Sequence, residues 1–533
     1  MAVQEKVRLE RAAFPEQVGV CSKAIQAYME DVEASGIESH SFMVLRHGKV
    51  AFETWREPYS PDMPHTLYSV SKSVTSLAIG FAVAEGILSL DDKVIEFFPE
   101  HRPKEPDPWL EKMTVWHLLT MTSGKDVSLL SSKAGGQWVK QFFAAATTFE
   151  PGTDWKYISE NTYMLCAILH KVIGTPIRDF LVTRLFEPLG IDRYPFWEVD
   201  ENGVEAGGWG LYLTTEELAK IVLCCQQMGK FNGKQVIPED WVREATKSQA
   251  YNPEHGGASD AGHGYGFCFW MNGEDRGYRF DGMFSQFGIV MPEYDAVLVL
   301  TDSEINEHKV LACVWRHFPA AFIDDCETEP ADACRGMTYR PLADLPAKPR
   351  SPLEKSIDGK TIRFPKKMIS NLVGFPVSML SMAVTYMSAD RAGNMDRMVF
   401  RFTEDECILS WEEGKEKNSI VCGMDGKQRR SPMHLGGIDL TAASTAAWTD
   451  EKTLELLVRP MEVIAARSMR FRFKGNKVSM WPSSTPNMKH AFAFLATGVG
   501  QFYSNKLLVK IIQTLLPYAY LLLEPKHSGK MQK

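Results

Sequence analysis

A run of small and apolar residues at 74–85 (VTSLAIGFAVAE) is the feature that most restricts how this chain can fold. Such a run predicts a buried helix. An extended segment ends just before it, at Ser69-Val70-Ser71-Lys72. Ser69 is therefore expected on the first turn, beside unpaired backbone N–H groups and the positive end of the helix dipole. Lys72 follows three residues later and shares a face with it.

This pair of side chains has the chemistry that nucleophilic catalysis needs. An ammonium at Lys72 would stabilise an alkoxide at Ser69, and the neutral amine would accept the serine proton. The alternative is structural, an N-cap serine followed by a solvated lysine. Because Ser-x-x-Lys occurs by chance in many chains of this length, the choice between the two depends on the rest of the sequence.

Five further segments accompany the pair, in order along the chain. They are Gly86–Asp92 (GILSLDD), His117–Gly124 (HLLTMTSG), Pro151–Ser159 (PGTDWKYIS), Gly207–Thr214 (GGWGLYLT) and Phe280–Gln286 (FDGMFSQ). Together with Ser69 and Lys72 they resemble the serine β-lactamase-like hydrolases of the class C group. That family comprises class C β-lactamases, DD-peptidases, esterases, D-aminopeptidases and nylon-oligomer hydrolases. The resemblance extends over residues 15–320.

The resemblance implies an α+β catalytic domain with the β-lactamase/transpeptidase-like fold, over residues 1–340. An antiparallel sheet flanked by helices would be joined to an all-helical part. A hairpin at 42–52 and strands within 261–270 and 278–301 would build the sheet. The segment 69–250 would supply the helices, and the site would lie at the seam between the two parts.

Three residues receive catalytic roles from the resemblance. Ser69 would be the nucleophile, and Lys72 and Tyr157 would act as the general base and acid. A nearby ammonium lowers the pKa of a phenol, whereas burial lowers the pKa of a lysine. The sequence therefore leaves open which of the two is the base.

Ser159 occupies the place of the asparagine in the β-lactamase motif Tyr-x-Asn. Its hydroxyl can hold Lys72 or the substrate amide. The resemblance associates Tyr-x-Ser with esterase, peptidase and nylon-oligomer hydrolase members. This departure counts against efficient hydrolysis of cephalosporins.

The segment around Gly282 is expected to complete the site. The backbone N–H groups of Ser69 and Met283 would form the oxyanion hole, and Gly282 would let the strand approach the substrate. The family pattern Lys-Thr-Gly or His-x-Gly is replaced here by Phe280-Asp281-Gly282. The cation that would bind the carboxylate of a β-lactam or a peptidoglycan stem is therefore missing.

Two further side chains of this segment have open roles. Asp281 would favour a cationic or polar group of the substrate, or would simply face solvent. Gln286 would line the pocket or brace the strand.

Composition and motifs restrict the remaining classes of function. With 533 residues and a net charge of −8 there is room for a second domain, and no basic tract predicts nucleic-acid binding. The sequence contains no dinucleotide-binding, P-loop or zinc motif, so neither a metal nor an organic cofactor is implied. His117 lies in an apolar stretch and is expected to be structural, and His263 is expected to border the pocket.

The ten cysteines are scattered and do not suggest a disulfide framework. Cys166, Cys224 and Cys225 lie in apolar helical stretches and are expected in the core. The first residues lack the apolar core of a secretory signal. A cytoplasmic location is the resulting expectation.

The C-terminal part divides into three segments. Residues 341–355 are proline-rich (PLADLPAKPRSP in their first part) and predict a linker. Residues 356–485 contain alternating runs at 397–402, 454–458 and 469–474, which predict a small antiparallel barrel or sandwich. This β-rich domain would cover the active site as a lid, stabilise the chain or mediate dimerisation.

Residues 486–533 form an apolar tail that is expected to be helical. Its most apolar part, 507–523, is interrupted by Lys510, Gln513 and Pro517 and is slightly short for a membrane span. It would pack on the catalytic domain, form a homodimer contact or a peripheral membrane contact, or cross the membrane.

These observations predict a serine hydrolase that cleaves a small ester or amide through an acyl-enzyme at Ser69. The alternatives are a D-aminopeptidase, a DD-peptidase or β-lactamase-type activity, an acyltransferase to an amine or alcohol, and a slow acylatable sensor or binding protein. The identity of the substrate is left open, because the pocket walls come from loops.

Overall fold

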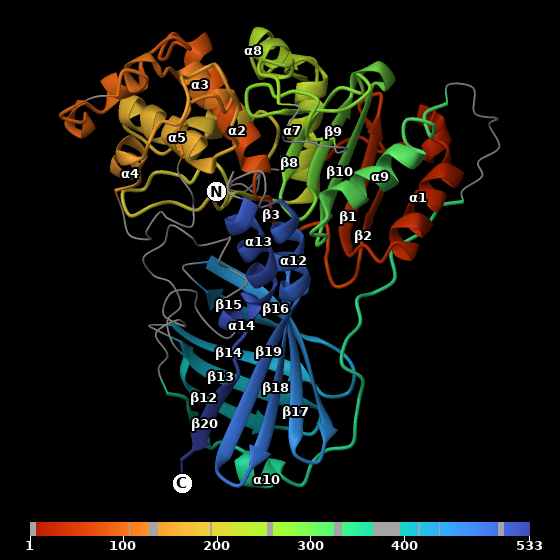
Figure 1. Cartoon of the computed structure of the whole chain (residues 1–533). Coiled ribbons are helices and arrows are strands. Elements are labelled where there is room, and N and C mark those ends of the chain that lie inside the picture. The colour runs from red at the N-terminus through yellow and green to blue at the C-terminus, as the bar shows by residue number, and fades with distance from the viewer. Residues whose placement is uncertain are drawn as a thin grey trace. The chain divides into compact units, whose positions relative to one another are not determined.

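The structure is a computed structural model that describes residues 7–105, 107–126, 137–191, 195–252, 260–323, 333–365, 395–413, 416–435, 438–498 and 506–532. The chain divides into two compact units, Met1–Tyr339 and Arg340–Lys533. The first unit contains both helices and strands, whereas the second is built mainly from strands (Figure 1).

An antiparallel sheet of six strands forms the centre of the first unit. In spatial order the strands are β2 (Lys49–Trp55), β1 (Ser39–Arg46), β10 (Ala296–Asp302), β9 (Gln286–Met291), β8 (Tyr278–Gly282) and β7 (Trp270–Met271). Every residue of β1, β9 and β10 is buried. The hairpin expected at 42–52 is present, and its turn places His47 and Gly48 at positive φ.

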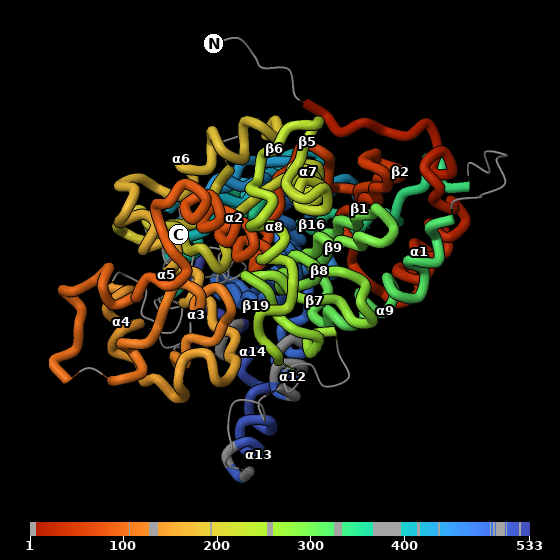
Figure 2. Tube along the Cα trace, turned by 90° about the horizontal axis from the view of Figure 1, so that it is seen from above, coloured from red at the N-terminus to blue at the C-terminus, as the bar shows by residue number. Residues whose placement is uncertain are grey.

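Helices cover both faces of this sheet. Helices α1 (Ser22–Ala34) and α9 (Glu307–His317) lie side by side and share one apolar core with β1, β9 and β10 (Figure 2). Helix α7 (Thr215–Gln226) packs on the opposite face, where Gly288 of β9 makes room for Val222. Burial on both faces explains why these strands are apolar throughout rather than alternating.

The helical part of the first unit surrounds α2 (Val70–Ala84), the helix that the apolar run predicts. Nearly every residue of α2 is buried, and the helix lies between α5 and α8 in both whole-chain views (Figures 1 and 2). Its end near Ser69 also contacts β8 of the sheet. The remaining helices are α3 (Val115–Leu119), α4 (Trp138–Ala144), α5 (Ser159–Ile173), α6 (Ile177–Leu181), α8 (Glu239–Ala245) and the short helices η1 (Pro15–Val18), η2 (Val94–Phe97), η3 (Pro99–His101), η4 (Leu110–Lys112), η5 (Val182–Phe186) and η7 (Pro292–Tyr294).

Short strand pairs complete this unit. They are β3 (His65–Thr66) with β4 (Tyr212–Leu213), and β5 (Lys230–Phe231) with β6 (Lys234–Gln235). The prediction of a strand over 261–270 is wrong except at the end of this range, where β7 begins. Gly264 (φ 112°) and Cys268 (φ 63°) leave the extended region, so the chain turns repeatedly before Trp270.

The second unit is a β-barrel. Its ten strands, in spatial order, are β14 (Glu416–Gly423), β13 (Glu406–Glu413), β12 (Met395–Phe402), β11 (Thr361–Arg363), β20 (His527–Met531), β19 (Lys477–Thr485), β18 (Ala466–Lys474), β17 (Thr453–Pro460), β16 (Ile438–Asp450) and β15 (Arg429–Leu435). A pairing between Gly423 and Thr445 joins β14 to β16 and brings the two ends of the sheet together. Burial alternates along most of β18 and β19: Met469, Phe471, Phe473, Val478 and Met480 are buried, whereas Arg470, Arg472 and Trp481 are exposed.

The proline-rich segment before the barrel forms hydrogen bonds with β16 and with the turn after it. The Leu345 amide donates to Thr445 Oγ1, and Ser351 Oγ donates to the Glu451 carbonyl. The short helix α10 (Glu354–Ile357) comes next, and its Glu354 pairs with Arg350.

The described part of the tail after β19 contains three α-helices, a short 3₁₀ helix and a final strand. They are α12 (Met488–Gly498), α13 (Lys506–Leu515), η10 (Leu516–Tyr518), α14 (Tyr520–Leu523) and β20. The strand β20 inserts between β11 and β19, a pairing that the helical expectation for the tail did not include. None of the described helices has both the length and the apolar character to cross a bilayer.

Candidate active site

Ser69 stands at the first turn of α2, as expected, with its side chain half-buried. It occupies the N-cap position, but its hydroxyl makes no capping hydrogen bond. The residue before it, Tyr68, is buried with a left-handed backbone (φ 45°), which is costly for a residue with a large side chain. The turn thus presents a serine hydroxyl that is not used to stabilise the helix end.

Lys72 lies one turn further on and is only 1% exposed. Its Nζ donates to Ser69 Oγ at 2.9 Å, to Ser159 Oγ at 3.0 Å and to the Gly208 carbonyl at 2.8 Å. The alternative of a solvated lysine is therefore excluded. Three partners match the three hydrogens of an ammonium; a neutral amine would instead donate to two of them and direct its lone pair at the third.

Burial lowers the pKa of Lys72 to about 7, against the opposing influence of Cys268, Glu160 and Asp281. A substantial fraction of the amine is consequently neutral at neutral pH. Cys268 does not add a charge of its own, because burial raises the pKa of its thiol to about 12.

Tyr157 lies in the loop before α5, with its ring 4.8 Å from Lys72 Nζ. Burial raises the pKa of this phenol well above its ordinary value, and a hydrogen bond with Ser69 offsets part of that rise. At a pH at which Lys72 begins to lose its proton, Tyr157 therefore still keeps its own. The hydrogen bond with Ser69 also places the phenol at the serine hydroxyl.

Glycine at position 208 is required by the space around it. A Cβ atom there would lie 2.7 Å from Thr162 Oγ1 and 3.0 Å from Ser159 Cβ. Without a side chain, the backbone comes close enough to α5 for the Gly208 carbonyl to reach Lys72. The sequence marks Gly207–Thr214 as a family segment but gives no hint that a carbonyl of this loop holds the lysine.

The end of β8 packs directly against the start of α2. A Cβ atom at Gly282 would lie 2.4 Å from the Leu67 carbonyl oxygen and 3.2 Å from the Val70 amide nitrogen. Gly282 therefore lets the strand approach the Ser69 turn, whereas the expectation concerned its approach to the substrate. Met283 follows at the sheet edge, with its side chain half-exposed.

Gln286 braces the turn that carries Met283. Its Nε2 donates to the carbonyls of Phe284 at 2.9 Å and Asp302 at 2.8 Å, and the residue is fully buried. The Phe284 amide in turn donates to the Glu307 carboxylate. Of the two roles expected for Gln286, the contacts are those of a brace.

Asp281 is committed to a neighbouring cation. Its Oδ2 accepts from Arg279 Nε at 2.7 Å, and both side chains are largely buried. Arg279 also donates to the Met271 carbonyl and to Asn272 Oδ1, each at 3.2 Å. Asp281 therefore does not face solvent, and Arg279 does not replace the missing carboxylate-binding cation.

An aromatic wall that the sequence analysis did not identify stands beside Tyr157. The ring of Trp270 lies 5.3 Å from that of Tyr157, and the rings of Trp155 and Tyr265 lie about 6 Å from it. These residues come from two segments, 155–157 and 265–270, so only the folded chain brings them together. The wall gives the surroundings of Tyr157 an apolar character.

Neither histidine considered from the sequence takes part in these contacts. His117 Nδ1 accepts from the Thr114 amide at 3.0 Å and closes the first turn of α3. Burial lowers its pKa to about 4, as suits a structural role. His263 is 4.0 Å from Asp260.

A half-buried serine on the first turn of a buried helix, a buried lysine against its hydroxyl and a tyrosine from the loop before α5, beside an antiparallel sheet, define a serine hydrolase of the β-lactamase type. The family comparison agrees. The family model described as Beta-lactamase matches residues 22–305, more than half of the chain, and the chain belongs to this family. The expected fold, including the smaller β-rich domain, is confirmed.

Among curated relatives, the chain is 27% identical to a 6-aminohexanoate-dimer hydrolase from Paenarthrobacter ureafaciens, over 55% of this chain and 80% of the relative. It is 30% identical to esterase EstB from Burkholderia gladioli, over 28% of this chain and 44% of that esterase. Among solved structures, the octameric penicillin-binding protein homologue from Pyrococcus abyssi superposes with a TM-score of 0.45 at 16% identity, covering 86% of this chain and 97% of that one.

Proposed function

We propose that this enzyme hydrolyses a small ester or amide through an acyl-enzyme at Ser69, with Lys72 as general base and Tyr157 as proton donor. The observation that carries the proposal is the 2.9 Å contact between Lys72 Nζ and Ser69 Oγ at a lysine that is almost completely buried. A base must lie within hydrogen-bonding reach of the proton it removes and have a pKa near the working pH. The pKa of about 7 meets the second condition.

The proton can be followed through one cycle. Neutral Lys72 takes the proton of Ser69 as Oγ attacks the substrate carbonyl carbon, and the resulting oxyanion is bound by the backbone N–H groups of Ser69 and Met283. When the tetrahedral intermediate collapses, Tyr157 protonates the leaving group and regains a proton from the Lys72 ammonium. Water then repeats the sequence on the acyl-enzyme and restores Ser69.

The pKa values support this division of roles over the reverse one. Burial favours the neutral form of each group, which is the amine for Lys72 and the phenol for Tyr157. A phenolate base would instead require the buried tyrosine to ionise.

The substrate class follows from the charges at the site. A β-lactam or a peptidoglycan stem presents a carboxylate, but Phe280 stands where the family has a cation and Arg279 is held by Asp281. The aromatic wall around Trp270 favours an uncharged, apolar acyl group. The names of the relatives, a 6-aminohexanoate-dimer hydrolase and an esterase, support an amide or an ester as the bond that is cleaved.

A substrate panel tests the proposal. It would contain p-nitrophenyl esters, short neutral amides, D-amino-acid amides and nitrocefin, with Ser69→Ala as control. We expect steady turnover of esters or neutral amides, at least about a hundredfold faster than nitrocefin, and its loss in Ser69→Ala. Faster turnover of nitrocefin, or a single burst without steady state, would contradict the proposed activity. Product ratios with added alcohol would distinguish acyl transfer from hydrolysis.

A further inference from the structure

The C-terminal unit exposes a row of apolar side chains along its last helices. We define the tail stripe as Leu507, Ile511, Leu515, Tyr518 and Leu521, which are between 47% and 70% exposed. The first four follow one another at intervals of three or four residues, so they continue along one side of the helical segment. Large apolar residues exposed in series mark an interaction surface rather than ordinary surface composition.

Helix α13 is strongly amphipathic. Lys506, Lys510, Gln513 and Thr514 form its polar side, and all its other residues are Leu, Val or Ile. Part of the apolar side is half-buried, as at Val509 and Ile512, while Ile511 and Leu515 remain exposed. The apolar side of α13 therefore includes exposed residues in addition to those that are half-buried.

The stretch of sequence that contains the tail stripe carries charge of one sign. Residues 463–523 contain no Asp or Glu and eight Lys or Arg, although acidic residues outnumber basic ones in the whole chain, 67 to 59. The nearest acid, Glu524, is buried in hydrogen bonds with Arg467 at 2.8 Å and Ser484 at 2.6 Å. These bonds also fix the end of α14 to β18 and β19.

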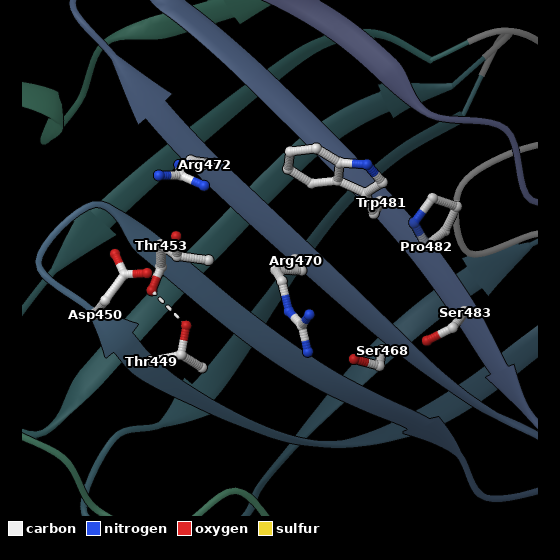
Figure 3. A pocket seen from close by; sticks show the side chains of 9 residues that line it. All are labelled: Thr449, Asp450, Thr453, Ser468, Arg470, Arg472, Trp481, Pro482 and Ser483. Carbon is white, nitrogen blue, oxygen red and sulfur yellow. Dashed lines mark hydrogen bonds between the residues drawn. The ribbon is translucent and has the colours of Figure 1, made fainter.

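The barrel presents the same charge together with an aromatic ring. Figure 3 shows Arg470 and Arg472 of β18 and Trp481 of β19 around a shallow cavity of about 710 Å³. Lys526, two residues beyond the anchored Glu524, lies over the Trp481 ring at 4.7 Å. Asp450 lies at the edge of this cavity, and Glu455 contacts Arg470 at 3.4 Å.

We propose that the tail stripe and the neighbouring basic residues bind the surface of an anionic phospholipid membrane. Exposed leucines and isoleucines of an amphipathic helix enter the boundary between headgroups and acyl chains. Lysines and arginines attract anionic headgroups, and tryptophan favours the interfacial depth. The absence of acidic residues over 463–523 selects a negatively charged partner over a second copy of this chain, whose net charge is only −8 and whose matching face is equally basic.

Vesicle flotation of the full chain tests this proposal. The probes are vesicles of phosphatidylcholine alone and of phosphatidylcholine with phosphatidylglycerol. We expect binding to the second kind and release at high salt, because exposed charges are then screened. Replacement of Ile511, Leu515 and Leu521 together by Ser should lower the partition coefficient at least about tenfold. Arg470→Ser with Arg472→Ser should lower it about fivefold per residue, on anionic vesicles only.

Val172→Ser and Tyr251→Ser are the matched controls, because both side chains are exposed apolar residues of the catalytic unit. They should leave vesicle binding unchanged. Absence of binding to anionic vesicles, or binding that the triple variant retains, would overturn the proposal. So would light scattering that shows a dimer dissociated by the triple variant, without any vesicle binding. Ester hydrolysis measured in parallel is independent of these outcomes, and an unchanged calorimetric transition of the C-terminal unit reports that the variants are folded.

Discussion

At the scale of single residues, the proposed catalysis depends on one buried lysine. Lys72 has polar partners in Ser69, Ser159 and Gly208, and burial disfavours its charged form. The same fold contains a second buried lysine with similar properties. Lys125 is 1% exposed, donates to the Ala145 carbonyl at 2.8 Å and has its pKa lowered to about 8 by burial. Within the described part of the chain its Nζ donates to backbone carbonyls rather than to a hydroxyl, which makes the two lysines a natural comparison.

Lys72→Gln should lower kcat/KM by about 10²–10⁴-fold, since an amide can occupy the same hydrogen bonds but cannot accept the Ser69 proton. Steady-state kinetics on an ester that the wild type turns over would measure the loss. Lys125→Gln is the control and should leave kcat/KM within about twofold. An equal loss in both variants would mean that Lys72 affects activity only through the stability of the fold.

The pH dependence of kcat/KM should show an acid limb with a midpoint near 7. The folded pKa of Lys72 lies below its ordinary value, so the amine is protonated and inactive as a base below about pH 7 and becomes active above it. No basic limb is expected up to pH 9, because the pKa of Tyr157 is raised. A neutral ester substrate excludes titration of the substrate itself. Activity that falls between pH 6 and 8 would contradict the assignment of the base.

At the scale of elements, the site is the meeting point of the first turn of α2, the first turn of α5 and the end of β8. Helices α2 and α5 could be predicted because their apolar runs are local signals. The residues proposed as catalytic could be placed along the chain because the motifs put Ser69 and Lys72 at the start of α2 and Tyr157 just before α5. The contact between β8 and α2 depends on Gly282, whose close approach to Leu67 becomes visible only in the folded chain.

Other features of the site could not be predicted, since each depends on contacts with another segment. The position of Arg279, which donates to Asp281, also depends on a hydrogen bond that Arg279 donates to Asn272 on a neighbouring segment. The wall beside Tyr157 needs Tyr265 and Trp270, which lie more than a hundred residues later.

Gly282→Ala should lower kcat by about 10²–10³-fold, because the added Cβ would push β8 away from the Ser69 turn and displace the Met283 amide. Gly288→Ala is the matched control on the adjacent strand. Its Cβ would meet the Val222 side chain at 2.5 Å, so it should lower Tm without a selective loss of kcat. Full activity of a folded Gly282→Ala enzyme would show that the strand does not supply the oxyanion donor.

At the scale of the whole molecule, the chain has two compact units with separate apolar cores. The barrel could be predicted as β-rich from its alternating strands. Its closing strand β20 could not, because His527–Met531 is short and polar and follows an apolar helical segment. Its position between β11 and β19 is set by the barrel rather than by its own sequence.

Differential scanning calorimetry should therefore show two transitions. Leu456→Ala in the barrel core should destabilise one of them by about 2–5 kcal/mol, and Leu298→Ala in β10 should destabilise the other by a similar amount. Hydrolysis at 25 °C should survive in Leu456→Ala. A single transition that both substitutions shift equally would indicate that the two units unfold together.

The most direct test of the account is to locate the acyl group. The enzyme would be exposed to a fluorophosphonate or an activated ester, and its intact mass and peptides would be measured. We predict one adduct per chain, on Ser69, absent from Ser69→Ala and formed at least about a hundredfold more slowly in Lys72→Gln. An adduct on another residue, or none on well-folded protein, would contradict the account.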